Sequence, residues 1–228
     1  MRLYDHRNHR LYINACERRR FIAAANAAPP TQRALCLTLL YTGCRLSEAL
    51  ALTPDALQLG APLVTFRTLK RRDVQVMREV PIPPVLVDQF LALCATAGER
   101  EGTRPLWQQD GTSVNRVTAY RWVKAVMATA GISGAQACPK GLRHGYGIHA
   151  TLSGVQLHML AKWMGHASLS TTQIYAAACG PEEQLIAARM WDEGDGVAEA
   201  ASRRADADRR PCGHEGCGSP PCLPRPSG

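Results

Sequence analysis

The chain has 228 residues, 46% of them hydrophobic, and a formal net charge of +8. This length is sufficient for one domain with appendages, and the apolar runs are much shorter than the roughly 20 residues of a membrane span, so we expect no membrane partner. The N-terminus lacks the apolar segment of a signal peptide, which favours a cytoplasmic protein. Most basic residues are arginine, whose forked guanidinium suits phosphate, so a polyanionic partner is a reasonable hypothesis that charge alone does not decide.

The nine cysteines are scattered along the chain. An odd number in a chain without an export signal is typical of small buried side chains rather than of a disulfide framework. Three of them, with one histidine, lie in the tail segment CGHEGCGSPPC, which runs from Cys212 to Cys222. Because this segment lacks the paired CxxC motifs of strong zinc sites, we expect no bound metal.

The first half of the chain predicts helices. Residues 1–12 show no periodic pattern and are interpreted as a leader, ahead of a domain over residues 13–191. A helix is predicted from Asn14 to the prolines at 29 and 30, and Thr31 is predicted to cap a second helix that is apolar almost all round and therefore central. Gly43 ends this helix, and a short helical turn is predicted to begin at Arg45.

The middle of the chain changes to a strand pattern. Residues 63–66 and 74–82 predict a small antiparallel hairpin, and the turn between them, residues 67–73, contains four basic residues. Helices are predicted after the prolines at 83 and 84 and again over residues 113–131, where basic residues alternate with an apolar stripe. The fold class is therefore mainly α with a small antiparallel sheet.

The last part of the chain predicts a helix from Pro139 to Gly154, followed by the segment LAKWMGHASLSTTQIY over residues 160–175. Residues 182–191 can form one more short amphipathic helix. Residues 192–228 are rich in Gly, Ala, Pro and Cys, and their low apolar content predicts disorder.

Four separated motifs contain the residues that can act on a phosphate. They are YTGCRLSEAL with Arg45, TLKRR with Lys70, KGLRHGYG with Lys140 and Arg143, and MGHASLSTTQIY with His166 and Tyr175. Taken alone, Tyr175 would be interpreted as a core tyrosine whose hydroxyl finds a partner. Together and in this order, the motifs resemble the catalytic domain of the tyrosine recombinases, also called the phage integrase family, over residues 16–191.

This resemblance implies a metal-free and cofactor-free reaction on double-stranded DNA. Tyr175 would attack a phosphodiester, forming a 3′-phosphotyrosyl enzyme and freeing a 5′ hydroxyl. Arg45 and Arg143 would donate to the phosphate oxygens and stabilise the transition state. His166 would hydrogen-bond the same phosphate, and Lys70 would protonate the leaving 5′ oxygen, although a solvated hairpin charge remains an alternative for this lysine.

One departure from the family's pattern leaves the proton transfer from Tyr175 open. Most family members have histidine where this chain has Lys140, which is assigned here to phosphate binding with proton transfer as a hypothesis. The group that takes the proton of Tyr175 is therefore undecided. Glu48 resembles the acidic residue that supports the first arginine, with a plain surface carboxylate as the alternative. His144 follows Arg143 directly, points to another part of its helix and is interpreted as structural.

The resemblance implies a site-specific recombinase or integrase that works as a tetramer, with residues 182–191 docking on a neighbour. Family members usually carry an N-terminal helical domain that closes a clamp around DNA, and only residues 1–12 precede the domain predicted here. Two alternatives therefore remain at this stage. One is a catalytically silent DNA-binding remnant or regulator that lacks the clamp domain, and the other is a type IB topoisomerase.

Overall fold

The computed structural model describes residues 2–68, 76–97, 104–176, 184 and 187–188. Contacts divide the chain into two units, Met1–Glu183 and Gln184–Gly228, and the first unit contains every element described below. Within the described residues, no helix combines the length and the apolar character that crossing a bilayer would need. The predicted tail and most of the predicted helix over residues 182–191 lie outside the described residues.

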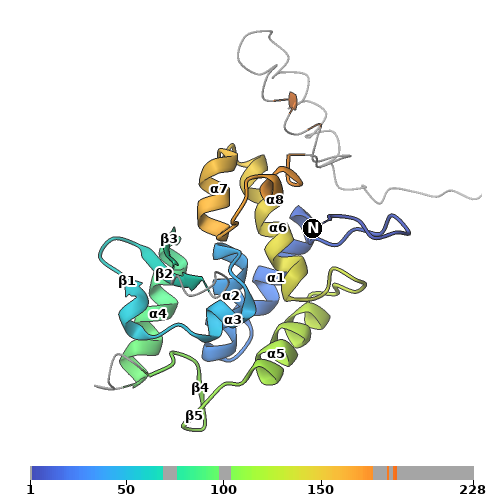
Figure 1. The fold of residues 1–228 in the computed structure, drawn as a ribbon. Helices are drawn as coiled ribbons and strands as arrows, with labels where there is room; N and C mark the ends of the chain where they lie inside the picture. Colours follow the sequence, from blue (N-terminus) through green and yellow to red (C-terminus); the bar gives the residue numbers. More distant parts are fainter. Residues whose placement is uncertain (1, 69–75, 98–103, 177–183, 185–186, 189–228) are drawn as a thin grey trace, which may run out of the picture. The chain divides into compact units, whose positions relative to one another are not determined.

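Helix α2 (Pro30–Thr42) is the centre of the larger core. It packs against α1 (Ala15–Asn26), α4 (Pro84–Ala97), α5 (Arg116–Thr129) and α6 (Pro139–Leu152), as Figure 1 shows. Buried leucines on nearly all its faces explain this position. The prediction that Thr31 caps the helix is wrong, because the helix begins one residue earlier at Pro30, whose ring already has a helical φ and has no N–H to satisfy.

Local signals fix the ends of several other helices. Asn14 caps α1 in a capping box with Glu17, and Asn115 caps α5 by accepting a hydrogen bond from the Thr118 N–H. Gly43 adopts a left-handed φ of 59° at the end of α2, where a Cβ would lie 2.3 Å from the Tyr146 ring. This glycine therefore allows both the sharp turn into α3 (Leu46–Leu50) and the close approach of α6.

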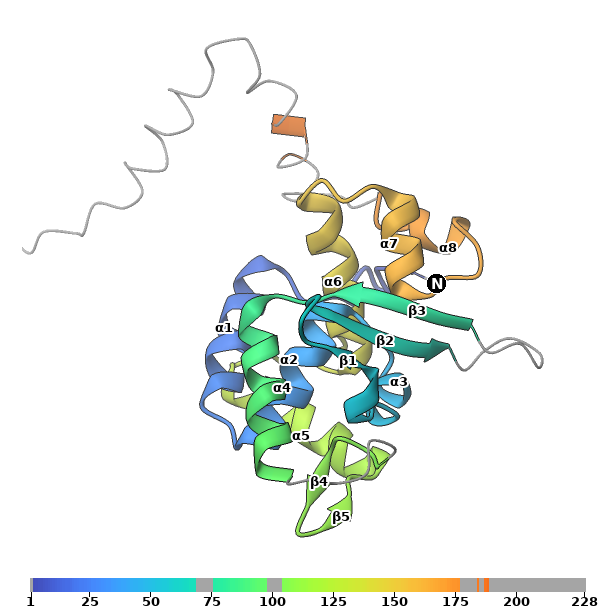
Figure 2. The ribbon, with the colours of Figure 1, turned by 90° about the vertical axis from the view of Figure 1, so that its left-hand side faces the viewer.

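The predicted hairpin is present as an antiparallel pair, β2 (Leu63–Thr68) and β3 (Val76–Pro81), to which β1 (Leu57–Gln58) adds a third strand after the 3-10 turn η1 (Pro54–Ala56). Figure 2 shows the hairpin lying beside α3 with α7 (Leu157–Met164) next to β3. A second ribbon joins β4 (Gln108–Gln109) and β5 (Thr112–Ser113). The observed architecture confirms a mainly helical fold with small antiparallel sheets.

A smaller apolar cluster surrounds the end of the described chain. It joins α6, α7 and α8 (Ser170–Gln173) to the N-terminal segment. Leu3 and Tyr12, in the segment predicted as a leader, are buried in this cluster together with Tyr175. The N-terminal residues thus pack on the same helices that position the predicted nucleophile, while the predicted domain boundaries at residues 12 and 191 remain predictions.

Candidate active site

Glu48 holds two arginines from different parts of the chain. Its carboxylate accepts a hydrogen bond of 2.6 Å from Arg45 Nη1 and another of 2.6 Å from Arg78 Nη2. The carboxylate also accepts the backbone N–H of Arg45 at 2.8 Å, so the first turn of α3 orients the arginine that precedes it. The predicted contact between Glu48 and Arg45 is therefore present in the structure, and the carboxylate is buried rather than on the surface.

Arg78 is a buried arginine that joins the hairpin to the helices. Its Nε donates to the carbonyl of Trp163 at 2.9 Å and its Nη1 to Thr68 Oγ1 at 3.0 Å. The guanidinium also lies 5.0 Å from the centre of the Phe66 ring. Each of the three guanidinium nitrogens thus donates to a protein group, and Arg78 fixes β3 against α3 and α7.

Arg143 is held by two backbone carbonyls in the centre of the site. Nη1 donates to the carbonyl of Gly43 at 2.6 Å and Nη2 to that of Met164 at 2.7 Å. Burial and the nearby Arg45 guanidinium lower the pKa of Arg143 to about 10, so this side chain remains charged at neutral pH. The two guanidinium cations repel each other, and a bound phosphate would relieve that repulsion, so the site favours an anion.

His166 follows the left-handed Gly165 that ends α7. Its Nδ1 lies 2.7 Å from Thr172 Oγ1 in α8, and its Nε2 is buried without a hydrogen-bond partner among the described residues. Burial and the charges of Arg143 and Arg45 lower the pKa of His166 to about 4. The imidazole is therefore neutral at neutral pH, and Nε2 has free hydrogen-bonding capacity next to the arginines.

Tyr175 is fully buried, at 0% relative exposure, and its ring packs against α6. Its ring lies so close to Gly147 that a Cβ there would approach Cε1 and Cζ of the phenol to 2.5 Å. The His166 ring lies nearly parallel to the phenol ring, with ring centres 6.4 Å apart and an angle of 14° between the planes. Burial raises the pKa of Tyr175 to about 12, although Arg143 and Arg45 oppose this rise.

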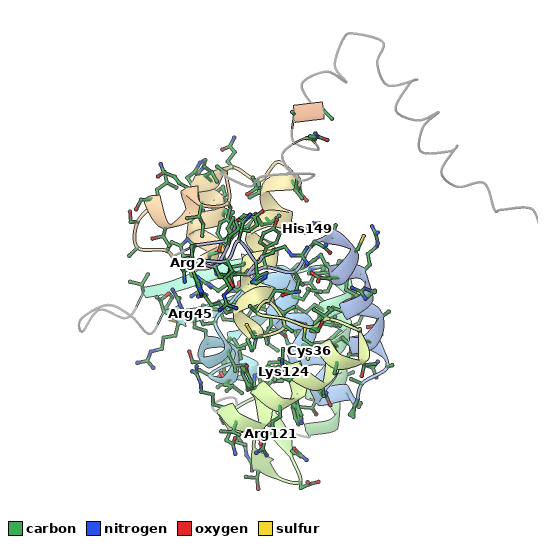
Figure 3. All side chains as sticks on the ribbon, turned by 90° about the vertical axis from the view of Figure 1, so that its right-hand side faces the viewer. Arg2, Cys36, Arg45, Arg121, Lys124 and His149 are labelled. Carbon is green, nitrogen blue, oxygen red and sulfur yellow. The ribbon has the colours of Figure 1, made fainter. Side chains whose placement is uncertain are left out.

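A pocket of about 580 Å³ lies beside this cluster. Its lining includes Arg45, Thr68, Arg78, Lys162, His166 and Thr171, so it runs between the hairpin and the segment that follows α7. Figure 3 shows the Arg45 side chain next to the hairpin. The pocket offers a cationic surface large enough for a phosphate group and its neighbours.

Comparison with known proteins identifies the family of this chain. The model of the phage integrase family matches residues 11–179, which is most of the chain. The chain belongs to the phage integrase family. The tyrosine recombinase XerC of Brucella suis is 35% identical to it over 160 residues, which cover 68% of this chain and 47% of the relative. The resolvase of Escherichia coli is 28% identical over 185 residues, or 67% of this chain and 69% of the relative.

Solved structures share the fold of this integrase-family chain. The XerA recombinase superposes with a TM-score of 0.67 at 23% identity, covering 80% of this chain and 62% of XerA. The catalytic domain of bacteriophage HP1 integrase superposes with a TM-score of 0.55 at 20% identity, covering 82% of this chain and 96% of that domain. The chain thus spans about half the length of its XerC relative and nearly all of an isolated integrase catalytic domain.

The structure brings together four of the six predicted site residues, namely Arg45, Arg143, His166 and Tyr175. Lys140 lies exposed in the first turn of α6, and its charge contributes to the pKa of His144. Lys70 lies outside the described residues.

Two contacts of this site were not predicted from the sequence. Arg78 has the same strand parity as the buried Val80, so an inward-facing arginine was a usable signal for a buried carboxylate partner. His144, interpreted as structural, lies against Tyr175, with Nδ1 3.2 Å from the phenol oxygen. Nothing in the local sequence predicts that second contact, because the two residues are 31 positions apart.

Proposed function

We propose that this integrase-family protein is a site-specific recombinase that cuts and rejoins DNA through a covalent bond between Tyr175 and a 3′ phosphate. One observation carries the proposal: a buried tyrosine lies within electrostatic reach of two arginines, Arg143 and Arg45, in a chain of this family. A phenol is a sufficient nucleophile for phosphodiester cleavage when cations stabilise the transition state. No metal or cofactor takes part in the proposed reaction.

Arg45 and Arg143 are proposed to bind the non-bridging oxygens of the scissile phosphate. Each keeps N–H groups beyond those used by Glu48, Gly43 and Met164, since a guanidinium has five donors. Removing one such donor should raise the barrier by about 3 kcal/mol, by analogy with other oxyanion contacts. His166 is proposed to donate or accept through its unpartnered Nε2 on the same phosphate.

Lys70 is proposed as the general acid for the 5′ oxygen, and Lys140 as a further phosphate contact. The proposal for Lys70 rests on its position in the sequence between β2 and β3, because those strands border the pocket. Lys140 fits phosphate binding because it lies one helical turn before Arg143. A positioned acid of this kind contributes about 100 to 10,000-fold in rate.

Helix α5 is proposed as part of the surface that holds double-stranded DNA. Its exposed residues include Arg116, Arg121 and Lys124, and Figure 3 shows the latter two on this helix. Among related folds, the XerH recombinase was solved bound to its difH substrate. With a net charge of +8, binding to DNA should weaken steeply as salt rises. The tetramer on DNA and the cytoplasmic location are proposed on the family's pattern.

The test is a covalent-adduct assay on nicked suicide duplexes and four-way junctions. The wild type should form a protein–DNA adduct that survives denaturation, whereas Tyr175→Phe should form none. Tyr41→Phe, which alters a half-buried tyrosine on α2, is the matched control and should keep the adduct. Absence of any wild-type adduct would favour the silent DNA-binding alternative, and relaxation of supercoiled plasmid without strand exchange would favour a type IB topoisomerase.

A further inference from the structure

His144 touches the atom that is proposed to attack DNA. Its Nδ1 lies 3.2 Å from the hydroxyl oxygen of Tyr175, and both side chains are 0% exposed. Within the described part of the chain, this imidazole is the one hydrogen-bond partner of the phenol. We propose that His144 accepts the proton of Tyr175 when the phenol attacks the phosphate. This inference rests on the proposed recombinase function and assigns the proton acceptor within the same site.

The other candidate acceptors are placed less well. Lys140 is exposed, and in its ammonium form it has no lone pair to accept a proton. Neither ring nitrogen of His166 is hydrogen-bonded to the phenol, since Nδ1 is engaged by Thr172 and Nε2 has no partner among the described residues. The ring of His144 is tilted by 58° against the phenol, which lets Nδ1 meet the hydroxyl.

The packing on α6 keeps this pair together. His144 and Gly147 are one helical turn apart, and the missing side chain of Gly147 lets the phenol lie against the helix backbone. Nε2 of His144 is buried without a partner among the described residues, so Tyr175 is the partner that decides how the ring is placed. Burial of both groups excludes solvent water as the immediate proton acceptor in this arrangement.

The charges around His144 favour its acceptance of the Tyr175 proton once DNA is bound. Burial, together with the charges of Lys140 and Arg143, lowers the pKa of His144 to about 4. His144 is therefore neutral at neutral pH and has a free lone pair. A phosphate held at Arg143 brings negative charge beside His144 and offsets the effect of the neighbouring cations, which makes the imidazole a stronger base in the complex.

The proposed step exchanges one phosphate ester bond for another and transfers two protons. The Tyr175 oxygen forms a bond to phosphorus, the bond between phosphorus and the 5′ oxygen breaks, and the phenol proton moves to His144 Nδ1. The departing 5′ oxygen receives a proton from the general acid, proposed to be Lys70. Religation by a 5′ hydroxyl reverses each transfer, so His144 returns its proton to the leaving phenol and no co-reactant is consumed.

The test compares His144→Asn and His144→Leu with the wild type across pH 6 to 9. Asparagine retains a hydrogen-bonding group near the Nδ1 position and cannot take a proton, while leucine retains neither property. The substrate carries sulfur in place of the scissile 5′ oxygen, because a thiolate leaves without protonation and the general acid drops out of the pH profile. Thermal unfolding and DNA affinity of each variant establish that it is folded and binds.

The adduct rate of the wild type should be nearly independent of pH. Both variants should be about 100-fold slower at pH 7, as expected for loss of a positioned base. Their rates should rise towards tenfold per pH unit, because Tyr175 must then lose its proton to solvent. A wild-type profile in His144→Asn, or slower variants with an unchanged pH slope, would show that His144 only positions the phenol. Failure of the wild type to form any adduct would instead refute the proposed function.

Discussion

Replacing Arg78 with leucine removes the side chain that connects the hairpin to the helical part of the site. The substitution deletes the ion pair with Glu48 and the hydrogen bonds to Trp163 and Thr68. The side chain of Arg78 is 4% exposed and that of Glu48 is fully buried, so water does not replace these contacts. The carboxylate retains Arg45 as its remaining ionic partner.

Loss of one partner from a buried ion pair costs about 3 to 5 kcal/mol, because the other charge remains buried with weaker compensation. For a domain of about 150 to 250 residues, each kcal/mol shifts the melting temperature by about 2 to 4 °C. Arg78→Leu should therefore lower the free energy of unfolding by about 3 kcal/mol or more and the melting temperature by roughly 6 to 20 °C. Arg78→Lys keeps the charge but not the fork, so it should be intermediate.

Urea unfolding followed by circular dichroism measures the effect, and a double-mutant cycle with Glu48→Gln isolates the pairwise part. Arg67→Leu, which changes an exposed arginine on β2 of the same hairpin, is the matched control and should alter stability by less than about 0.5 kcal/mol. A loss below about 1 kcal/mol for Arg78→Leu, or additive effects in the cycle, would refute the argument that Arg78 and Glu48 act as one buried unit.

Three further changes test the surroundings of the nucleophile. Gly147→Ala places a Cβ 2.5 Å from the phenol of Tyr175, so it should destabilise the domain by about 1 to 3 kcal/mol in urea unfolding; unchanged stability would contradict the packing. Thr172→Val removes the hydroxyl that orients His166, and should slow adduct formation about tenfold while costing about 1 kcal/mol of stability. Burial would raise the pKa of Glu48, but its arginine partners lower this pKa below the usual 4.5. The stabilisation that the Glu48 carboxylate provides is therefore present above pH 4.5 and is lost as the pH falls through the lowered pKa. The stability gap between wild type and Glu48→Gln should accordingly shrink in urea titrations from pH 5 to pH 3, and a constant gap would contradict this assignment.

Local patterns determined the elements. Alternation of apolar residues predicted the hairpin of β2 and β3. Proline predicted the start of α6 at Pro139, and glycine predicted the end of α2 at Gly43. These predictions succeeded because such signals act within a few residues. The one wrong cap, Thr31, shows the limit of such signals. Pro30 and Thr31 are neighbours, and either residue can mark the start of a helix. The φ of proline is already helical, and α2 starts at Pro30.

By itself, the sequence determined the family and the helical fold, and it predicted the residues that can act on a phosphate, since their order along the chain forms specific motifs. Only the tertiary structure decided that Arg78 shares Glu48 with Arg45 and that His144 meets the hydroxyl of Tyr175. These contacts join residues 30 and 31 positions apart, and they depend on how β3 and α6 pack against other elements. Spacing along the chain encodes which side chains share an element, whereas the packing of separate elements determines which polar groups must find each other once water is excluded.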